Sequence, residues 1–173
     1  MIARKLSRSL ALALTFALAL PALTGCKNVP TIPGTEIPDS DENREILQVL
    51  ERYRTAMVRQ DRASILATAH GTYYDESGTD DPSDDVTYEE LPELLRVRLG
   101  QVDSIRFTME YLDIYVRNDR ATVHVWIDAA IHMKPLLNED GTPRLQPRFT
   151  RQQDYAKFEL IRDGESWRIT KGI

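Results

Sequence analysis

The stretch Ser104–Met133 (SIRFTMEYLDIYVRNDRATVHVWIDAAIHM) decides the fold, because its apolar and polar side chains alternate with a period of two. This alternation is typical of β-strands with one buried face. Asn118 and Asp119, near its middle, favour a two-residue hairpin turn. The pairs predicted from that turn are Val116 with Ala121, Ile114 with Val123 and Leu112 with Val125. Apolar residues then face each other across two long strands.

Two further features extend this hairpin into a sheet. The apolar parity of the first strand changes between Met109 and Leu112, which predicts a β-bulge near Glu110 or Tyr111. A second hairpin is predicted with its turn at Asp163-Gly164. Its predicted pairs are Leu160 with Trp167, Phe158 with Ile169, and Glu159 with Arg168. Together the hairpins predict a curved antiparallel sheet of about four long strands.

The segment before the sheet has helical periodicity. A stripe of apolar residues predicts a helix over about 41–59, with Asp39 or Ser40 as its cap. Asp61 begins a short second helix, 72–74 is a short strand, and a third helix ends at Gly100. The third helix starts either from a capping box at 87–90 or nearer Leu91. The predicted fold class is therefore α+β, with N-terminal helices packed on the sheet.

The first 26 residues have the form of a signal peptide. Basic residues at 4, 5 and 8 precede an apolar run of about 11 residues, shorter than the roughly 20 that span a bilayer. The sequence Leu23-Thr24-Gly25-Cys26 resembles the lipobox of bacterial lipoproteins. The resemblance implies that 1–25 is removed and that Cys26 is lipidated and anchors the protein to a membrane. An ordinary cleaved signal with an incidental thiol is the alternative.

The resemblance also implies a location in the cell envelope. Lys27 follows the cysteine where an Asp would resemble an inner-membrane retention signal, so the outer membrane is favoured if the cell has two. Residues 26–40 are expected to form a proline-rich tether that lacks an apolar face. In an extended conformation this tether would hold the domain, 41–173, up to roughly 40 Å from the membrane.

Composition excludes several function classes. The whole chain carries a net charge of -5, and an acidic protein lacks the basic surface that nucleic acid requires. One cysteine excludes an intrachain disulfide and a zinc site built on several cysteines. The 75–85 loop has six acids, but it lacks the spacing of an EF-hand, so a solvated loop is favoured over a calcium site. No cofactor or metal site is predicted.

A family resemblance follows from the order of the elements and from the phrases 53–61 (YRTAMVRQD) and 163–169 (DGESWRI). These resemble the nuclear-transport-factor-2-like (SnoaL-like, cystatin-like) superfamily over about 41–173. The resemblance implies a cone-shaped fold with a pocket between the helices and the sheet. Members include isomerases, dehydratases and domains without catalysis, so the fold does not select an activity.

Candidate site residues come from the predicted faces of the elements. Tyr53, Tyr73 and Tyr74 are candidate pocket residues, with buried core tyrosines as the alternative. The candidate interface residues, expected on the sheet face away from the helices, are Tyr111, Tyr115, His124 and Trp126. Such an aromatic surface suits a homodimer, although the rings could instead pack across strands.

The predicted function is a non-catalytic binding or interaction module, lipid-anchored outside the cytoplasm, whose partner is an unknown small molecule or envelope protein. No catalytic residue is assigned, because the inward positions between 123 and 133 are all apolar. His124 and Asp113 are predicted cross-strand neighbours, for which a surface ion pair is favoured over a base dyad. The alternative function is an isomerase or dehydratase that uses a pocket carboxylate from Asp75, Asp113 or Asp128.

Overall fold

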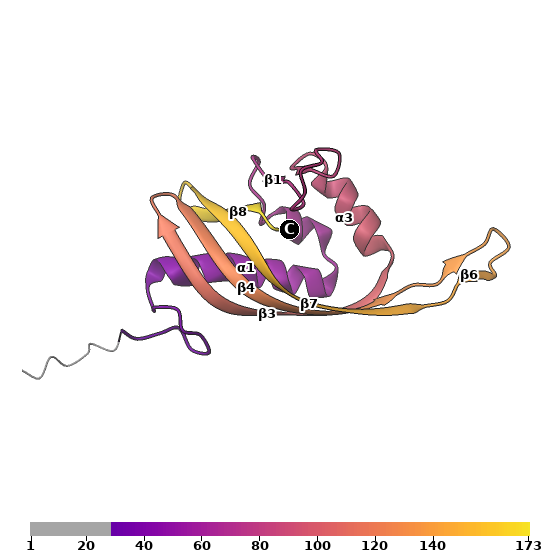
Figure 1. Ribbon diagram of the computed structural model, residues 1–173, viewed down its shortest axis with the longest axis horizontal. Helices are drawn as coiled ribbons and strands as arrows, with labels where there is room; N and C mark the ends of the chain where they lie inside the picture. The colour runs from indigo at the N-terminus through magenta and orange to yellow at the C-terminus, as the bar shows by residue number, and fades with distance from the viewer. Residues whose placement is uncertain (1–28) are drawn as a thin grey trace, which may run out of the picture.

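The computed structural model describes residues 29–173, and the leader and Cys26 lie outside them. Its helices are α1 (Asp41–Arg59), α2 (Arg62–Leu66) and α3 (Leu91–Gly100). Its main sheet is antiparallel, with β3 (Val102–Arg117), β4 (Arg120–Met133), β7 (Arg148–Asp163) and β8 (Ser166–Lys171) in the order β3-β4-β7-β8. The sheet curves around the helices (Figure 1), which confirms the predicted α+β fold. None of the helices in 29–173 is long and apolar enough to cross a bilayer.

The helix boundaries follow from local capping. The Ser40 hydroxyl accepts a hydrogen bond from the Asn43 N–H at 3.1 Å and begins α1, and Asp61 caps α2 by accepting from the Ser64 N–H. Helix α3 begins at Leu91, the later of the two predicted starts. The buried face of α1 then packs on β3 and β8 through a core that those strands share with β4 and β7.

The first hairpin has the predicted turn and one shifted pair. The predicted pairs of Val116 with Ala121 and of Ile114 with Val123 are confirmed. The bulge lies at Leu112 and leaves Tyr111 opposite Val125. The predicted pair of Leu112 with Val125 is therefore wrong. Because a bulge adds one residue to one strand, it changes which face the following side chains occupy. Tyr111 thus points toward α1 and not toward the outer face of the sheet.

The register of the second hairpin differs from the prediction. Gly164, at φ 60°, occupies the first loop position and Glu165 the second, which is where a type II′ turn places glycine. The observed pairs are Leu160 with Ile169, Ile161 with Arg168, and Arg162 with Trp167. This shift moves each partner by two positions and therefore preserves the faces, so that Leu160, Trp167 and Ile169 all remain buried.

The end of the expected tether is folded onto the domain. Thr31 pairs with Pro38, and the Ile32 N–H donates to the Ile37 carbonyl at 2.9 Å. Ile37 is only 1% exposed, so the expectation of a tether without buried apolar residues is wrong for this part. We call residues 31–38 the N-terminal clasp. A single buried side chain and a closed turn need no periodic pattern, which is why hydrophobic periodicity did not predict the clasp.

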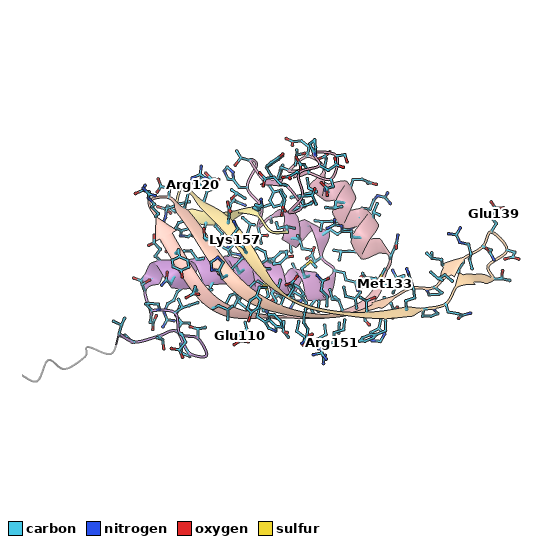
Figure 2. The ribbon with its side chains drawn as sticks, viewed as in Figure 1. Glu110, Arg120, Met133, Glu139, Arg151 and Lys157 are labelled. Atoms are coloured by element: carbon cyan, nitrogen blue, oxygen red, sulfur yellow. The ribbon has the colours of Figure 1, made fainter. Side chains whose placement is uncertain are left out.

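Strands β4 and β7 continue beyond the helices into a projecting arm, residues 134–147 (Figure 1). The arm contains the short strands β5 (Leu136–Leu137) and β6 (Pro143–Leu145), which pair with each other. Figure 2 shows Met133 at the base of the arm and Glu139 near its tip. Another small ladder joins β1 (Tyr74–Asp75) to β2 (Val86–Thr87) beside α3, on the side of α1 away from the middle of the sheet (Figure 1).

Candidate functional site

A cavity of about 520 Å³ opens on the concave side of the sheet. The ends of α1 and α3 form one wall, and β3, β4 and one residue of β7 form the other. The strands place mostly aliphatic side chains there, since they alternate with a period of two and present their apolar face to the helices. Its apolar residues on the strands are Val102, Ile105, Phe107, Ile127, Ala129, Ile131 and Met133.

A second hollow, of about 510 Å³, lies between α1 and α2, but its lining is of another kind. Most of its side chains are polar or charged, including Arg52, Arg59 and Asp61. Both of its acids already have partners, because Asp61 accepts hydrogen bonds from Ser64 as the α2 cap and Glu51 accepts from Arg54 and Tyr111. Ligand pockets are usually concave and mostly apolar, with a few convergent polar groups. The cavity on the concave side of the sheet is therefore the candidate site.

Tyr53 is the predicted pocket residue that the cavity contains. Its ring is 5% exposed and packs edge-to-face against Phe107 and Phe158, with centroids 6.0 and 5.4 Å away. Its hydroxyl makes no hydrogen bond with residues 29–173, unlike the hydroxyls of Tyr73 and Tyr111. Burial raises the pKa of Tyr53, and the nearby Arg98 charge opposes that rise. The hydroxyl therefore stays a neutral hydrogen-bond donor at the cavity wall.

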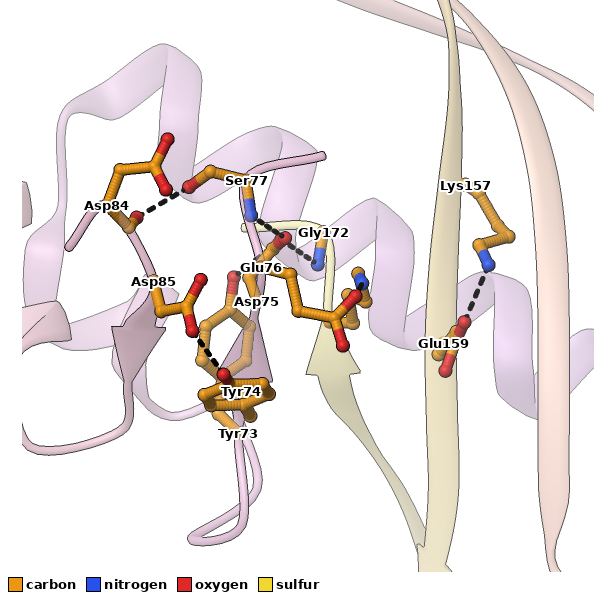
Figure 3. A network of polar contacts seen from close by, with 11 residues as sticks. Tyr73, Tyr74, Asp75, Glu76, Ser77, Asp84, Asp85, Lys157, Glu159 and Gly172 are labelled. Carbon is orange, nitrogen blue, oxygen red and sulfur yellow. Dashed lines mark hydrogen bonds and ion pairs between the residues drawn. The ribbon is translucent and has the colours of Figure 1, made fainter. Parts of the chain in front are cut away.

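Tyr73 and Tyr74 are not cavity residues. Tyr73 is buried, but its hydroxyl accepts from the Ile173 N–H at 3.0 Å and lies 3.3 Å from an Asp75 carboxylate oxygen. Tyr74 is 45% exposed and its hydroxyl bonds to Asp85 (Figure 3). The Tyr74 hydroxyl closes the loop between β1 and β2, and the Tyr73 hydroxyl joins that segment to Ile173, so both tyrosines are wrong as pocket residues.

Arg98 is the cavity residue that sequence reasoning missed. It lies in the last turn of α3, borders the cavity, and forms no ion pair with the residues that the structure describes. A signal for it was present in the sequence. Arg98 follows Leu91 by seven positions and Leu94 by four, so it falls on the apolar stripe of α3. A cation on an apolar stripe indicates a polar function or a position at the edge of the core.

The outer face of the sheet contains most of the predicted interface. Tyr115, His124 and Trp126 lie there, whereas Tyr111 does not, because its hydroxyl donates to the Glu51 carboxylate of α1 at 2.7 Å. Strand β7 adds rings that the sequence analysis did not include. Tyr155 is 73% exposed and packs against Trp126 at 4.6 Å, and Phe149 packs against His132 at 4.9 Å.

The candidate carboxylates lie outside the cavity. Asp113 is exposed beside His124, and its carboxylate forms no ion pair within 29–173. Arg151 binds Asp128 through two hydrogen bonds of 3.0 and 2.6 Å on the outer face, and these lower the pKa of Asp128. Asp75 accepts the Gly172 N–H at 3.0 Å (Figure 3). Gly172 has φ 108°, and a Cβ there would lie 2.8 Å from the Lys157 carbonyl oxygen, so Asp75 supports a structural turn that requires glycine.

Metal ligands are also not gathered in this part of the chain. Among residues 29–173, no group of three or more His, Cys, Asp or Glu side chains could hold a metal ion. In the acidic loop, Asp84 accepts from the Thr79 hydroxyl, and Asp81 accepts from the Ser83 N–H. These bonds fit the favoured interpretation of a solvated loop.

Comparison with known proteins identifies the fold. The sequence matches no protein-family model and no curated protein. A candidate dehydratase of the NTF2-like family from Streptomyces avermitilis is 13% identical, with a TM-score of 0.55 over 75% of this chain and 92% of that one. A protein of unknown function with a cystatin-like fold from Nostoc punctiforme is 15% identical, with a TM-score of 0.55 over 78% and 90%.

A candidate aromatic ring hydroxylase from Novosphingobium aromaticivorans is 16% identical, with a TM-score of 0.60 over 78% of this chain and 88% of that one. At such identities the likeness shows the nuclear-transport-factor-2-like, or cystatin-like, fold and no activity. The predicted fold is thereby confirmed.

Proposed function

We propose that this chain is an extracytoplasmic lipoprotein whose cone domain binds a small molecule with a hydrocarbon body and does not transform it. The observation that carries the binding proposal is the lining of the concave cavity. Its walls are mostly aliphatic and aromatic, and the lining residues that the structure describes include no carboxylate and no imidazole. Such a cavity binds a ligand by burying the apolar surface of that ligand, but it offers no group that accepts or donates a proton near neutral pH.

The proposed anchor is the lipidated Cys26, in register with the basic start and the short apolar run of the leader. The proposed location is the cell envelope, with the outer membrane favoured if the cell has two. The partners are then the membrane, through the lipid, and a small molecule within the cavity.

The competing proposal is a small-molecule enzyme of the isomerase or dehydratase type. Its support is the fold, because one of the structural neighbours is a candidate dehydratase. It would need an acid or base in the cavity. On the concave side Asp154 lies opposite Ile127, but its side chain is exposed and accepts from the Tyr155 N–H at 2.8 Å. The binding module is favoured because Asp154 is not part of the cavity lining.

Filling the cavity tests the binding proposal. Ala129→Phe places a ring in the cavity, whereas Ala130→Phe places the same ring on the opposite face of β4. The natively expressed protein is purified, denatured, and its released small molecules are measured by mass spectrometry. We expect wild type and Ala130→Phe to release the same amount of ligand per protein. Ala129→Phe should release at least about tenfold less. A cooperative thermal melting transition in each variant is the check that both variants fold.

Equal ligand content in the two variants would contradict binding in the cavity. Conversion of an added substrate by the wild type, and its loss in Asp154→Asn, would favour the enzyme.

We also propose that a second copy of the chain packs on the outer sheet face. Tyr115, His124 and Trp126 form its predicted core, and Tyr155 and Phe149 extend the aromatic surface. Aromatic residues are enriched at the centres of protein interfaces. The Arg151–Asp128 ion pair would add a polar contact at this surface.

Trp126→Glu should convert such a dimer into a folded monomer, because it places an unpaired charge in the middle of the contact. The matched control Trp126→Phe keeps an aromatic ring there and should remain dimeric. Light scattering over a range of concentrations measures the mass of each. A wild-type protein that is monomeric at high concentration would rule out this interface.

A further inference from the structure

The charge among the described residues that line the cavity is positive. Arg98 is the one charged side chain among the lining residues that the structure describes, and it forms no ion pair with 29–173. Two positions earlier on α3, Arg96 already has a partner, because its Nε donates to the Glu93 carboxylate at 2.7 Å. Arg96 is thus held by an acid of its own helix, whereas Arg98 is exposed and borders the cavity without an ion pair among the described residues.

A second donor lies close to this arginine. Tyr53 is 5% exposed and lines the same cavity, its hydroxyl makes no hydrogen bond within the described part of the chain, and Arg98 is near enough to affect it electrostatically. The Tyr53 hydroxyl is therefore free to donate a hydrogen bond to a ligand oxygen in the cavity. Hydrogen bonds to charged acceptors are stronger than neutral ones, so an arginine and a hydroxyl together suit an anionic oxygen.

The rest of the cavity suits a hydrocarbon. Ile105, Ile127, Ile131 and Met133 line it and are each only half-buried. These side chains keep apolar surface in contact with solvent, and covering that surface with an apolar group is favourable in proportion to the area removed from water.

We infer that the ligand is an amphipathic anion, with a negatively charged oxygen head at Arg98 and Tyr53 and a hydrocarbon body against the isoleucines and Met133. This inference rests on the proposed function, because it uses the same cavity. It adds the chemical class of the ligand, which the fold does not specify.

Three probes that share a ten-carbon chain separate the contributions of head and body: decanoate, 1-decanol and decylamine. Binding to the folded domain is measured by isothermal titration calorimetry below the micelle-forming concentration of each. We expect decanoate to bind about tenfold more tightly than decanol, and decylamine to bind most weakly. Arg98→Gln should lower decanoate affinity about tenfold and leave decanol affinity unchanged.

Arg96→Gln is the matched control, since it removes an arginine from the same helix without touching the cavity, and it should leave all three affinities unchanged. Tyr53→Phe should weaken decanoate while its ring keeps the core packed. Equal affinities of decanoate and decanol, or equal effects of Arg98→Gln and Arg96→Gln, would overturn the anionic class and leave cavity binding intact. Binding of no probe to the wild type would overturn the cavity proposal as well.

Discussion

Replacing Cys26 with serine should abolish lipidation and leave the leader attached to the chain. Serine offers no thiol for acylation, and the lipobox resemblance implies that removal of 1–25 depends on that step. The effect should be all or none, because each buried CH₂ contributes about 0.8 kcal/mol and two or three acyl chains anchor a protein firmly. Intact-mass measurement of the membrane-extracted protein and metabolic labelling with a fatty acid report both changes.

The matched control moves the cysteine to another position, so that the chain still has one thiol. In a Cys26→Ser, Asn28→Cys double variant the cysteine lies two residues beyond the motif, and we expect no acyl label. The wild type should need detergent for extraction. A freely soluble wild-type protein whose mature N-terminus is not Cys26 would show that the lipobox interpretation is wrong.

Replacing Ile37 with alanine should destabilise the domain by about 2–4 kcal/mol, as expected for removing a buried aliphatic side chain from a packed site. Ile37 is 1% exposed and lies in the N-terminal clasp, which borders Leu47 of α1 and Tyr111 of β3 across a shallow pocket. Its loss would leave a cavity under that turn. Urea unfolding followed by circular dichroism gives the free energy of unfolding.

Val29→Ala serves as the control, because Val29 precedes the clasp and is 63% exposed. It should change the free energy of unfolding by less than about 0.5 kcal/mol. A chain that begins at Ser40 should lose at least as much stability as Ile37→Ala, since it lacks the whole clasp. If that shorter chain is as stable as the mature protein, the clasp contributes nothing to the fold.

The parts of this fold that the sequence predicts are those set by periodic burial. The two-residue alternation of β3 and β4 and the turn at Asn118 place most cross-strand partners correctly, because a one-residue slip would turn every apolar side chain outward. The second hairpin shows the limit of this constraint. A shift that moves each partner by two residues preserves both faces, so the position of Gly164 in the turn decides the register.

Single residues outside a periodic pattern were harder to place. The bulge was expected, but its location at Leu112 decides where Tyr111 points, and one residue of error moved that ring to the wrong face. The predicted pocket tyrosines differ in how well their positions could be predicted, for a similar reason. Tyr53 lies on a helical stripe, and its position could be predicted, whereas Tyr73 is placed by hydrogen bonds to the distant Ile173.

The clasp also limits how far the domain can move from the bilayer if Cys26 carries the lipid. Folding of 31–38 leaves only 27–30 as a leash, and the reach from Cys26 to Thr31 is then at most about 18 Å, less than half of the roughly 40 Å expected for an extended segment. Such confinement raises the local concentration of the domain at the membrane surface. A protein held this close would collect amphiphiles as they leave the lipid layer, and it could not carry them across a wide aqueous gap while it remained anchored.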